Sequence, residues 1–375
     1  MQRTSLAAAR WQLELPRSWA STLFLGLLPL GLMVAVAVIV ATTGSKGSDF
    51  ATFWQSGHMV LHGKSPYPSL QSLPAVANRV TFDPFVYPPP AAFAMVPLSL
   101  LPFPLANVLF VTIGLACIAL ALRLLDVRDW RCYGAAYLSL PVFAAVGNGT
   151  VSPLLLLGVA AAWRYRGQTI AVAALIAALV ALKLFLWPLW LWLLFTRRFA
   201  ATVLSVTLAA VGTVLGWALI GFAGFREYPH LLGRLTKLVG PKSYSVYALE
   251  RTTGVSSQTA QLGLVALGLL LLGVVVGTLG RRRQDEHLFV AALAGALLLT
   301  PILWPHYLVL LFVPIALARR TLSALWFMPV VFWLDGATWS NGHPALIATS
   351  LTLAALTVLF ALQRRGRVTA GVAVA

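Results

Sequence analysis

Charged residues are scarce in this sequence, and acidic ones are the scarcest. Asp, Glu, Lys and Arg make up 10% of the 375 residues, and only 10 residues are acidic. A water-soluble domain needs far more charge to cover its surface, so the composition excludes an ordinary soluble protein. Instead, 59% of the residues are hydrophobic and fall in repeated runs of helical length, which predict a polytopic membrane protein.

Several chemical motifs are absent as well. The sequence has only two cysteines, Cys117 and Cys132, without a plausible partner or a metal-type spacing, and we interpret both as small packing residues. No G-x-x-x-x-G-K-[ST] or G-x-G-x-x-G motif and no Asp-x-Asp pair is present, so no nucleotide-binding loop or metal-holding pair is visible. We expect no cofactor and no metal.

The apolar runs predict an all-α bundle, because strands of a membrane barrel would alternate apolar and polar residues. We expect about 12 transmembrane spans. Their approximate limits are 19–41, 104–124, 133–147, 151–163, 168–182, 184–196, 199–221, 258–280, 288–304, 306–318, 321–334 and 344–362. The first run is long enough to span and is followed by others, so we interpret it as a span and not as a cleavable signal. The Pro-broken segment 88–102 is expected to be a re-entrant or interfacial helix.

The net charge of +17 does not point to nucleic acid, because basic residues punctuate the apolar runs and form no single patch. With a cytoplasmic N-terminus, every short inner connection is basic, as the positive-inside rule requires. The inner residues are Arg3, Arg10, Arg17, Arg123, Arg128, Arg131, Arg164, Arg166, Arg197, Arg198, Arg281, Arg282, Arg283, Arg319, Arg320, Arg364, Arg365 and Arg367. The outer residues are Lys46, Lys64, Arg79, Arg226, Arg234, Lys237, Lys242 and Arg251. Both termini are then cytoplasmic.

Two outer segments, about 42–87 and 222–257, are long, whereas the inner ones are only connectors. We therefore expect residues 1–375 to form a single integral membrane domain with its chemistry on the outer side. Asp49 follows the first span directly, before a probable interfacial helix at about 50–61. It is either a general base at the membrane rim or, with Ser48, a helix cap, and the residues alone favour the cap.

Other polar residues stand at the ends of apolar runs. Lys183 interrupts an apolar stretch, where a cation costs at least about 2.5 kcal/mol at mid-helix. It is either a phosphate ligand or a lysine that reaches the headgroups. His306, between Pro305 and Tyr307, could bind phosphate or a sugar hydroxyl, or be an interfacial histidine without chemistry. Asn148 lies in a further polar turn.

Three more features have competing interpretations. Tyr87 precedes three prolines and fits an interfacial aromatic belt. Arg251 belongs to a basic outer segment that either attracts anionic headgroups or covers a substrate cleft. His58 and His62 are spaced to face one metal, but no third ligand is evident nearby, so we do not predict a metal site.

Five segments taken together resemble glycosyltransferase family 87, the polyprenyl-phosphate-mannose-dependent α-mannosyltransferases of the GT-C class. They are SDFATFWQSGHMVLHGKSPY, FVYPPPAAFAMVPLSLLP, GNGTVSP, ALKLFLWPL and TPILWPHYLVLL, in the family's order. The chain departs from the family where Asn148 replaces a glutamine and where Leu184 replaces the proline after Lys183. The resemblance implies a GT-C bundle of transmembrane helices with interfacial helices in its outer loops.

The resemblance also implies roles. Asp49 matches the family's catalytic acidic residue. We therefore expect its carboxylate to act as the general base of an inverting transfer. The donor would be a polyprenyl-phosphate hexose, with mannose expected as the sugar, and the acceptor a glycolipid or glycan. Residues expected to bind donor or acceptor are Lys183, His306, Arg251, Tyr87, Asn148 and Tyr67. The lipid monophosphate explains the missing Asp-x-Asp pair, because no nucleotide has to be held.

Two other functions compete with a transferase. A flippase or transporter of lipid-linked sugars would place polar residues along a path at mid-membrane, whereas here they lie at the outer edge. A scaffold protein of an envelope complex would not require Asp49 and Lys183 to face one cleft.

Overall fold

The computed structural model describes residues 19–43, 49–70, 84–278, 284–335 and 340–363. Every regular element within these ranges is a helix, which confirms the all-α prediction for this part of the chain. Some predictions concern residues outside the described ranges, namely both termini and Arg3, Arg10, Arg17, Lys46, Ser48, Arg79, Arg281, Arg282, Arg283, Arg364, Arg365 and Arg367.

Five helical segments of the described chain are long and apolar enough to cross a membrane. They are Trp19–Val40, within α1 (Trp19–Thr22) and α2 (Leu28–Thr43), α5 (Phe103–Leu124), α11 (Phe199–Leu219), Ser257–Val275, within α14 (Ser257–Thr278), and α18 (Pro344–Leu362). On α14, Leu262, Leu269 and Leu270 are each more than 60% exposed. So large an exposed apolar surface is expected where a helix faces lipid. The chain is an integral membrane protein.

The predicted number of about 12 spans is not confirmed, because the other apolar runs form shorter helices. These are α6 (Trp130–Tyr137), α7 (Leu140–Gly147), α8 (Ser152–Arg164), α9 (Thr169–Leu182), α10 (Pro188–Phe195), α15 (Asp285–Leu299), α16 (Phe312–Ala318) and α17 (Met328–Val331). Proline near the start of α7, α10 and α17 explains several breaks, since it fits the first turn of a helix but not its interior.

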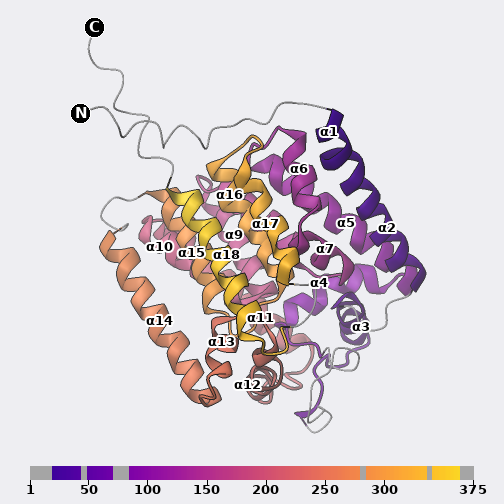
Figure 1. Cartoon of the computed structure of the whole chain (residues 1–375). Helices are drawn as coiled ribbons and strands as arrows, with labels where there is room; N and C mark the ends of the chain where they lie inside the picture. The colour runs from indigo at the N-terminus through magenta and orange to yellow at the C-terminus, as the bar shows by residue number, and fades with distance from the viewer. Residues whose placement is uncertain (1–18, 44–48, 71–83, 279–283, 336–339, 364–375) are drawn as a thin grey trace.

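Two helices cross the direction of the bundle. In Figure 1, α3 (Asp49–Leu61) and α12 (Tyr228–Val239) are seen nearly along their axes, while the long helices run across the view. α3 packs against α4 (Pro89–Ser99), and Gly57 permits the close approach, because a Cβ there would lie 2.9 Å from the carbonyl carbon of Met95. Ser99 Oγ then donates to the Trp54 carbonyl at 2.8 Å.

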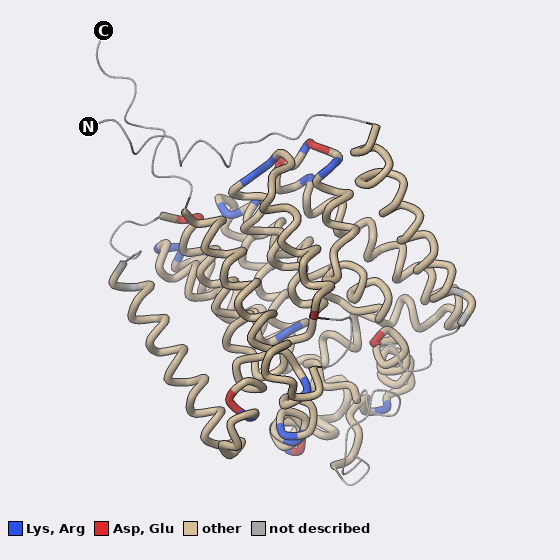
Figure 2. Tube along the Cα trace, in the orientation of Figure 1, with Lys and Arg blue, Asp and Glu red and all other residues tan. Residues whose placement is uncertain are grey.

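In Figure 2, Lys and Arg segments lie at both ends of the bundle, and one group of them lies at the top, away from α3. The side chain of Phe50 in α3 stacks on Phe103 and lies next to Gly149, so α5 and α8 both begin beside α3 and run away from it. Asp126 and Arg166 follow their far ends. We call this far end the basic end and the α3 end the outer end.

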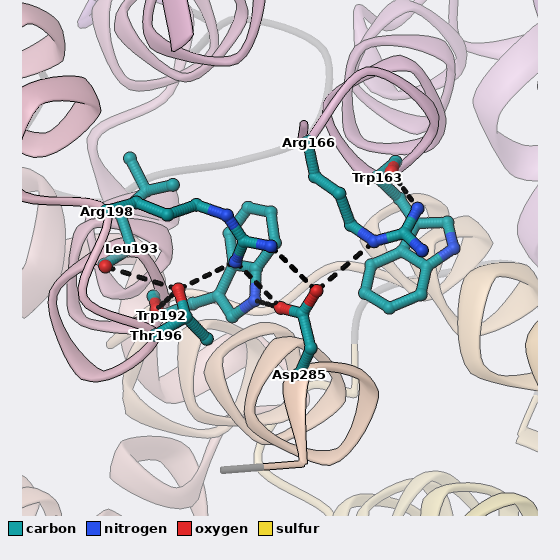
Figure 3. A network of polar contacts seen from close by, with 7 residues as sticks. All are labelled: Trp163, Arg166, Trp192, Leu193, Thr196, Arg198 and Asp285. Carbon is teal, nitrogen blue, oxygen red and sulfur yellow. Dashed lines mark hydrogen bonds and ion pairs between the residues drawn. The ribbon is translucent and has the colours of Figure 1, made fainter. Parts of the chain in front are cut away.

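A charged network ties three helices together at the basic end (Figure 3). Asp285, at the start of α15, accepts two hydrogen bonds of 2.8 Å from Arg198, one of 3.2 Å from Arg166 and one of 2.8 Å from Trp192 Nε1. Arg166 also lies over the Trp163 ring, 4.0 Å from its centroid. One carboxylate thereby connects the ends of α8 and α10 to α15.

The network also determines how Asp285 titrates. Burial acts to raise the pKa of Asp285, but hydrogen bonds from Arg198 and Trp192 and the charges of Arg198 and Arg166 outweigh it and hold the pKa below its usual range. A lowered folded-state pKa stabilises the fold above the unfolded value of about 4, and this stabilisation is lost as the pH falls through the folded value.

We predict that Asp285→Asn lowers the free energy of unfolding by about 2 kcal/mol at neutral pH, since an amide cannot accept the charged hydrogen bonds of two arginines. Thermal unfolding in detergent measures the change. Asp126→Asn is the matched control, because its 3.5 Å pair with Arg320 is 42% and 57% exposed and should contribute little. The difference in the free energy of unfolding between wild type and Asp285→Asn should narrow below about pH 4 and vanish once the pH falls below the folded-state pKa of Asp285. Equal changes in the unfolding temperature of Asp285→Asn and Asp126→Asn would contradict the stabilising role assigned to the Asp285 network.

Candidate active site

A cavity of about 760 Å³ lies at the outer end. Its wall is built from six parts of the chain: the start of α3, the extended segment 84–88, the end of α7, the break between α9 and α10, α12, and the stretch from the end of α15 to residue 307. Such a volume accommodates a small-molecule group, and the wall combines apolar side chains with several polar ones.

Asp49 lines this cavity as the first residue of α3. Its backbone N–H donates to the Asn148 carbonyl at 3.0 Å, which fixes the start of α3 against the end of α7. A carboxylate in the first turn of a helix is also favoured by the helix dipole. The dipole does not require the residue to face a cavity, so its place in the wall is the informative observation.

The Asn148 turn owes its shape to the following glycine. Gly149 has a φ of +60°, and its N–H and that of Thr150 donate to the carbonyls of Val146 and Ala145. This pair of bonds is the Schellman ending of a helix, which favours glycine at the left-handed position. The turn places Asn148 in the cavity wall and leaves room for Phe50, which follows Asp49.

Lys183 stands at a break between two apolar helices. α9 ends at Leu182, Lys183 is extended with φ −147° and ψ 104°, and a short 3₁₀ turn (η3, Leu184–Leu186) leads to α10. Pro188 opens α10 and prevents a continuous helix. The break directs Lys183 into the cavity, where its Nζ donates to Tyr307 Oη at 2.5 Å.

His306 is the second residue of the 3₁₀ helix η5 (Pro305–Leu311), which follows the turn after α15, and it is buried and lines the cavity. The fully buried residues Tyr244 and Ser245 hold this turn, since the Tyr244 N–H donates to the Leu303 carbonyl and Ser245 Oγ to the Pro301 carbonyl, both at 2.8 Å. The second outer segment therefore supports the wall that carries His306.

Tyr87 lines the cavity from the extended segment 84–88, which two other tyrosines hold in place. Tyr67 Oη donates to the Tyr87 carbonyl at 2.8 Å, and Tyr228 Oη to the Val86 carbonyl at 3.0 Å. Burial, together with the neighbouring Tyr228, raises the pKa of Tyr67, and burial raises that of Tyr228. Both hydroxyls therefore remain donors at neutral and moderately alkaline pH.

The structure thus brings five of the seven predicted site residues into one wall: Asp49, Tyr87, Asn148, Lys183 and His306. Tyr67 and Arg251 are not among the lining residues. Tyr67 instead supports Tyr87 from behind, and a guanidinium nitrogen of Arg251 donates to the Val255 carbonyl close by in the chain. The role of Tyr67 depends on a contact between separate segments, which the sequence did not reveal, whereas Arg251 makes a local contact.

Several lining residues were not predicted from sequence. Tyr307 follows His306 directly, and the need of Lys183 for a partner was a signal that could have identified it. α12 contributes Leu232, Leu235 and Thr236 from one face, and its helical spacing of apolar residues was a second signal.

No group of three potential metal ligands occurs among the described residues. The rings of His58 and His62 lie in contact, with centroids 4.4 Å apart and planes tilted by 35°, and a ring nitrogen of His62 bonds to the His58 carbonyl. The chemistry available in the wall is therefore that of one carboxylate, one ammonium, one imidazole and an amide. Such a set can accept a proton and bind an anion within one cavity.

A helical membrane protein with a polar cavity at one end of its bundle is the class that the fold and the site define. The family model described as Glycosyltransferase family 87 matches residues 85–305, and the chain belongs to this family. The predicted resemblance is thereby confirmed.

One curated relative is the polyprenol-phosphate-mannose-dependent alpha-(1-2)-phosphatidylinositol pentamannoside mannosyltransferase of Mycolicibacterium smegmatis. It is 26% identical over 276 residues, which cover 67% of this chain and 61% of the relative. The match thus spans less than two thirds of the relative's length. No solved structure matches the chain.

We predict that Gly149→Ala lowers the free energy of unfolding by about 1–2 kcal/mol, because an alanine resists the left-handed conformation. Its Cβ would also lie 2.8 Å from the Phe50 Cβ and push on the start of α3. Thermal unfolding measures the loss. Gly147→Ala is the control, since a Cβ there meets nothing within 4 Å and the residue ends α7. The interpretation fails if Gly149→Ala unfolds at the wild-type temperature.

Proposed function

We propose that the protein transfers a hexose, mannose in the first instance, from a polyprenyl-phosphate donor to an acceptor hydroxyl on a glycolipid or glycan. The observation that carries this proposal is that Asp49 and Lys183, which are distant in sequence, line one cavity. Family membership supports glycosyl transfer, and the mycobacterial relative supports the donor type.

Asp49 is the general base. Its carboxylate takes the proton of the acceptor hydroxyl while the acceptor oxygen attacks the anomeric carbon of the donor. The bond between that carbon and the phosphate oxygen breaks, and the electron pair leaves with the prenyl phosphate. Attack from the face opposite the phosphate inverts the anomeric centre, so a β-linked donor yields an α-linked product. One base suffices, because a phosphate monoester leaves without the second carboxylate that glycoside hydrolysis uses.

Lys183 and His306 bind the donor phosphate. The negative charge on the phosphate grows as the bond breaks, and a nearby ammonium stabilises that charge in a site with little water. Tyr87 and Asn148 complete the polar wall and would contact the sugar or the phosphate. Tyr67 acts through Tyr87 by the hydrogen bond to its carbonyl. The position of Arg251 gives no support for a direct contact with the donor.

A lipid-linked donor fits the wall beside Lys183. Leu184 and Trp187 line the cavity and are also 46% and 43% exposed on the bundle surface. They lie in the break between two apolar helices, where the bundle surface faces lipid, so a prenyl chain can lie against them while its phosphate reaches Lys183. A soluble sugar nucleotide would gain nothing from such an apolar border.

The basic end supports the orientation. Arginines at that end and the predicted basic inner loops agree with a cytoplasmic location under the positive-inside rule. The cavity then opens on the extracytoplasmic side of the cell membrane, both termini are cytoplasmic, and residues 1–375 act as one membrane domain. A lipid carrier provides an activated sugar on a side of the membrane without nucleotide sugars.

We predict that Asp49→Asn lowers transfer at least about 100-fold, because the amide keeps the shape but cannot accept the proton. Radiolabelled polyprenyl-phosphate-mannose, with a membrane lipid extract as acceptor, measures transfer by the purified protein. Glu227→Gln is the control, since this exposed acid precedes α12 and does not line the cavity. Retained transfer in Asp49→Asn would exclude the mechanism, and no transfer by the folded wild type would point to a flippase.

We predict that Trp187→Ala raises the KM for a long-chain polyprenyl donor roughly tenfold, through the loss of apolar contact. The KM for mannosyl methyl phosphate, a donor without a prenyl chain, should change little. Phe199→Ala, 56% exposed at the basic end, serves as the control. Equal effects on both donors would contradict a prenyl chain at this border.

A further inference from the structure

Two tyrosine rings enclose the Lys183 ammonium. Its Nζ lies 4.3 Å from the ring centroid of Tyr87 and 4.5 Å from that of Tyr307, and it donates a hydrogen bond of 2.5 Å to Tyr307 Oη. A cation over an aromatic face is attracted by the ring quadrupole, and more strongly where water is excluded. The ammonium is thus held by the Tyr307 hydroxyl and by the Tyr87 ring, from segments that meet only in the folded bundle.

Neighbouring groups fix both rings. The Tyr307 ring stacks on Phe185 with centroids 5.0 Å apart and planes 15° apart. The Tyr87 ring packs on Phe53 at 4.4 Å, and its carbonyl accepts the bond from Tyr67. Because these contacts hold both tyrosine rings in place, the rings restrict where the Lys183 ammonium can lie.

We propose that Tyr307 is a positioning residue for the transfer reaction, whose hydroxyl holds the Lys183 ammonium in place for the donor phosphate. The inference rests on the proposed role of Lys183 as a phosphate ligand. Residue 307 lies beyond the stretch 85–305 that the family model matches, so family membership assigns it nothing.

A positioning group is needed because of the chemistry of lysine. Its four-carbon stem has many rotamers, and ordering it costs free energy that would otherwise weaken donor binding. A hydrogen bond to Tyr307 orders the stem before the donor arrives, and one such bond also sets the direction of an ammonium with three donor hydrogens. The phosphate then meets a cation that is already placed.

The competing interpretation is that Tyr307 only fills space beside Phe185. Tyr307→Phe separates the two, because it keeps the ring and its stacking and removes the hydroxyl alone. A purely packing role predicts no change in phosphate binding. A positioning role predicts weaker binding that depends on the presence of Lys183.

The test is a double-mutant cycle on the purified full-length protein in detergent, with farnesyl phosphate as the probe. Calorimetry gives the Kd for wild type, Tyr307→Phe, Lys183→Met and the double variant, and unfolding temperatures verify that all four are folded. We expect Tyr307→Phe to raise the Kd about fivefold in the wild type, which corresponds to one ordinary hydrogen bond. In the Lys183→Met background the same change should have no further effect.

Tyr165→Phe is the control, because Tyr165 is 40% exposed at the basic end and should leave the Kd unchanged. An unchanged Kd in Tyr307→Phe would overturn the inference, and so would a fivefold loss that persists without Lys183. In both cases the phosphate role of Lys183 still stands if Lys183→Met binds weakly. If Lys183→Met binds as well as the wild type, the proposed role of Lys183 fails, and the inference with it.

Discussion

The site depends on one costly arrangement, an ammonium group placed in an apolar helical bundle. A cation at such a position costs at least about 2.5 kcal/mol unless it finds partners. The protein provides them by ending α9 at Leu182, so that Lys183 leaves the helix and reaches the Tyr307 hydroxyl and the Tyr87 ring. The segment before α4 and the turn after α15 must both be in place for these contacts, so much of the outer end is organised around one side chain.

The polar residues of the wall lie where helices begin or end. Asn148 is at the glycine-dependent end of α7, Lys183 at the break after α9, and His306 at the start of η5. Irregular backbone in a membrane protein is tolerated where it lines a cavity or is buried in protein. These three interruptions supply residues of the cavity wall, and such breaks also shorten the helices that would otherwise span the membrane.

This relation explains what the sequence could predict. Lys183 and Asp49 were identifiable because a charge is conspicuous in an apolar chain, and α3 begins one residue before its predicted start. The count of about 12 spans was not confirmed, because Ser139 and Lys183 divide runs whose helices are shorter than a span. The supporting role of Tyr67 depends on a hydrogen bond to the Tyr87 carbonyl in another segment, which no local pattern encodes. The absence of Arg251 from the cavity wall likewise depends on how the second outer segment folds.

The bond between Lys183 and Tyr307 joins residues 124 positions apart. During synthesis, Asp49 and Lys183 therefore reach the bilayer well before the segment that carries Tyr307. A partly inserted polypeptide carries Asp49 and Lys183 without the complete cavity wall around them. The wall is complete only after residue 307 has been synthesised, so the cavity cannot assemble until most of the chain has entered the membrane.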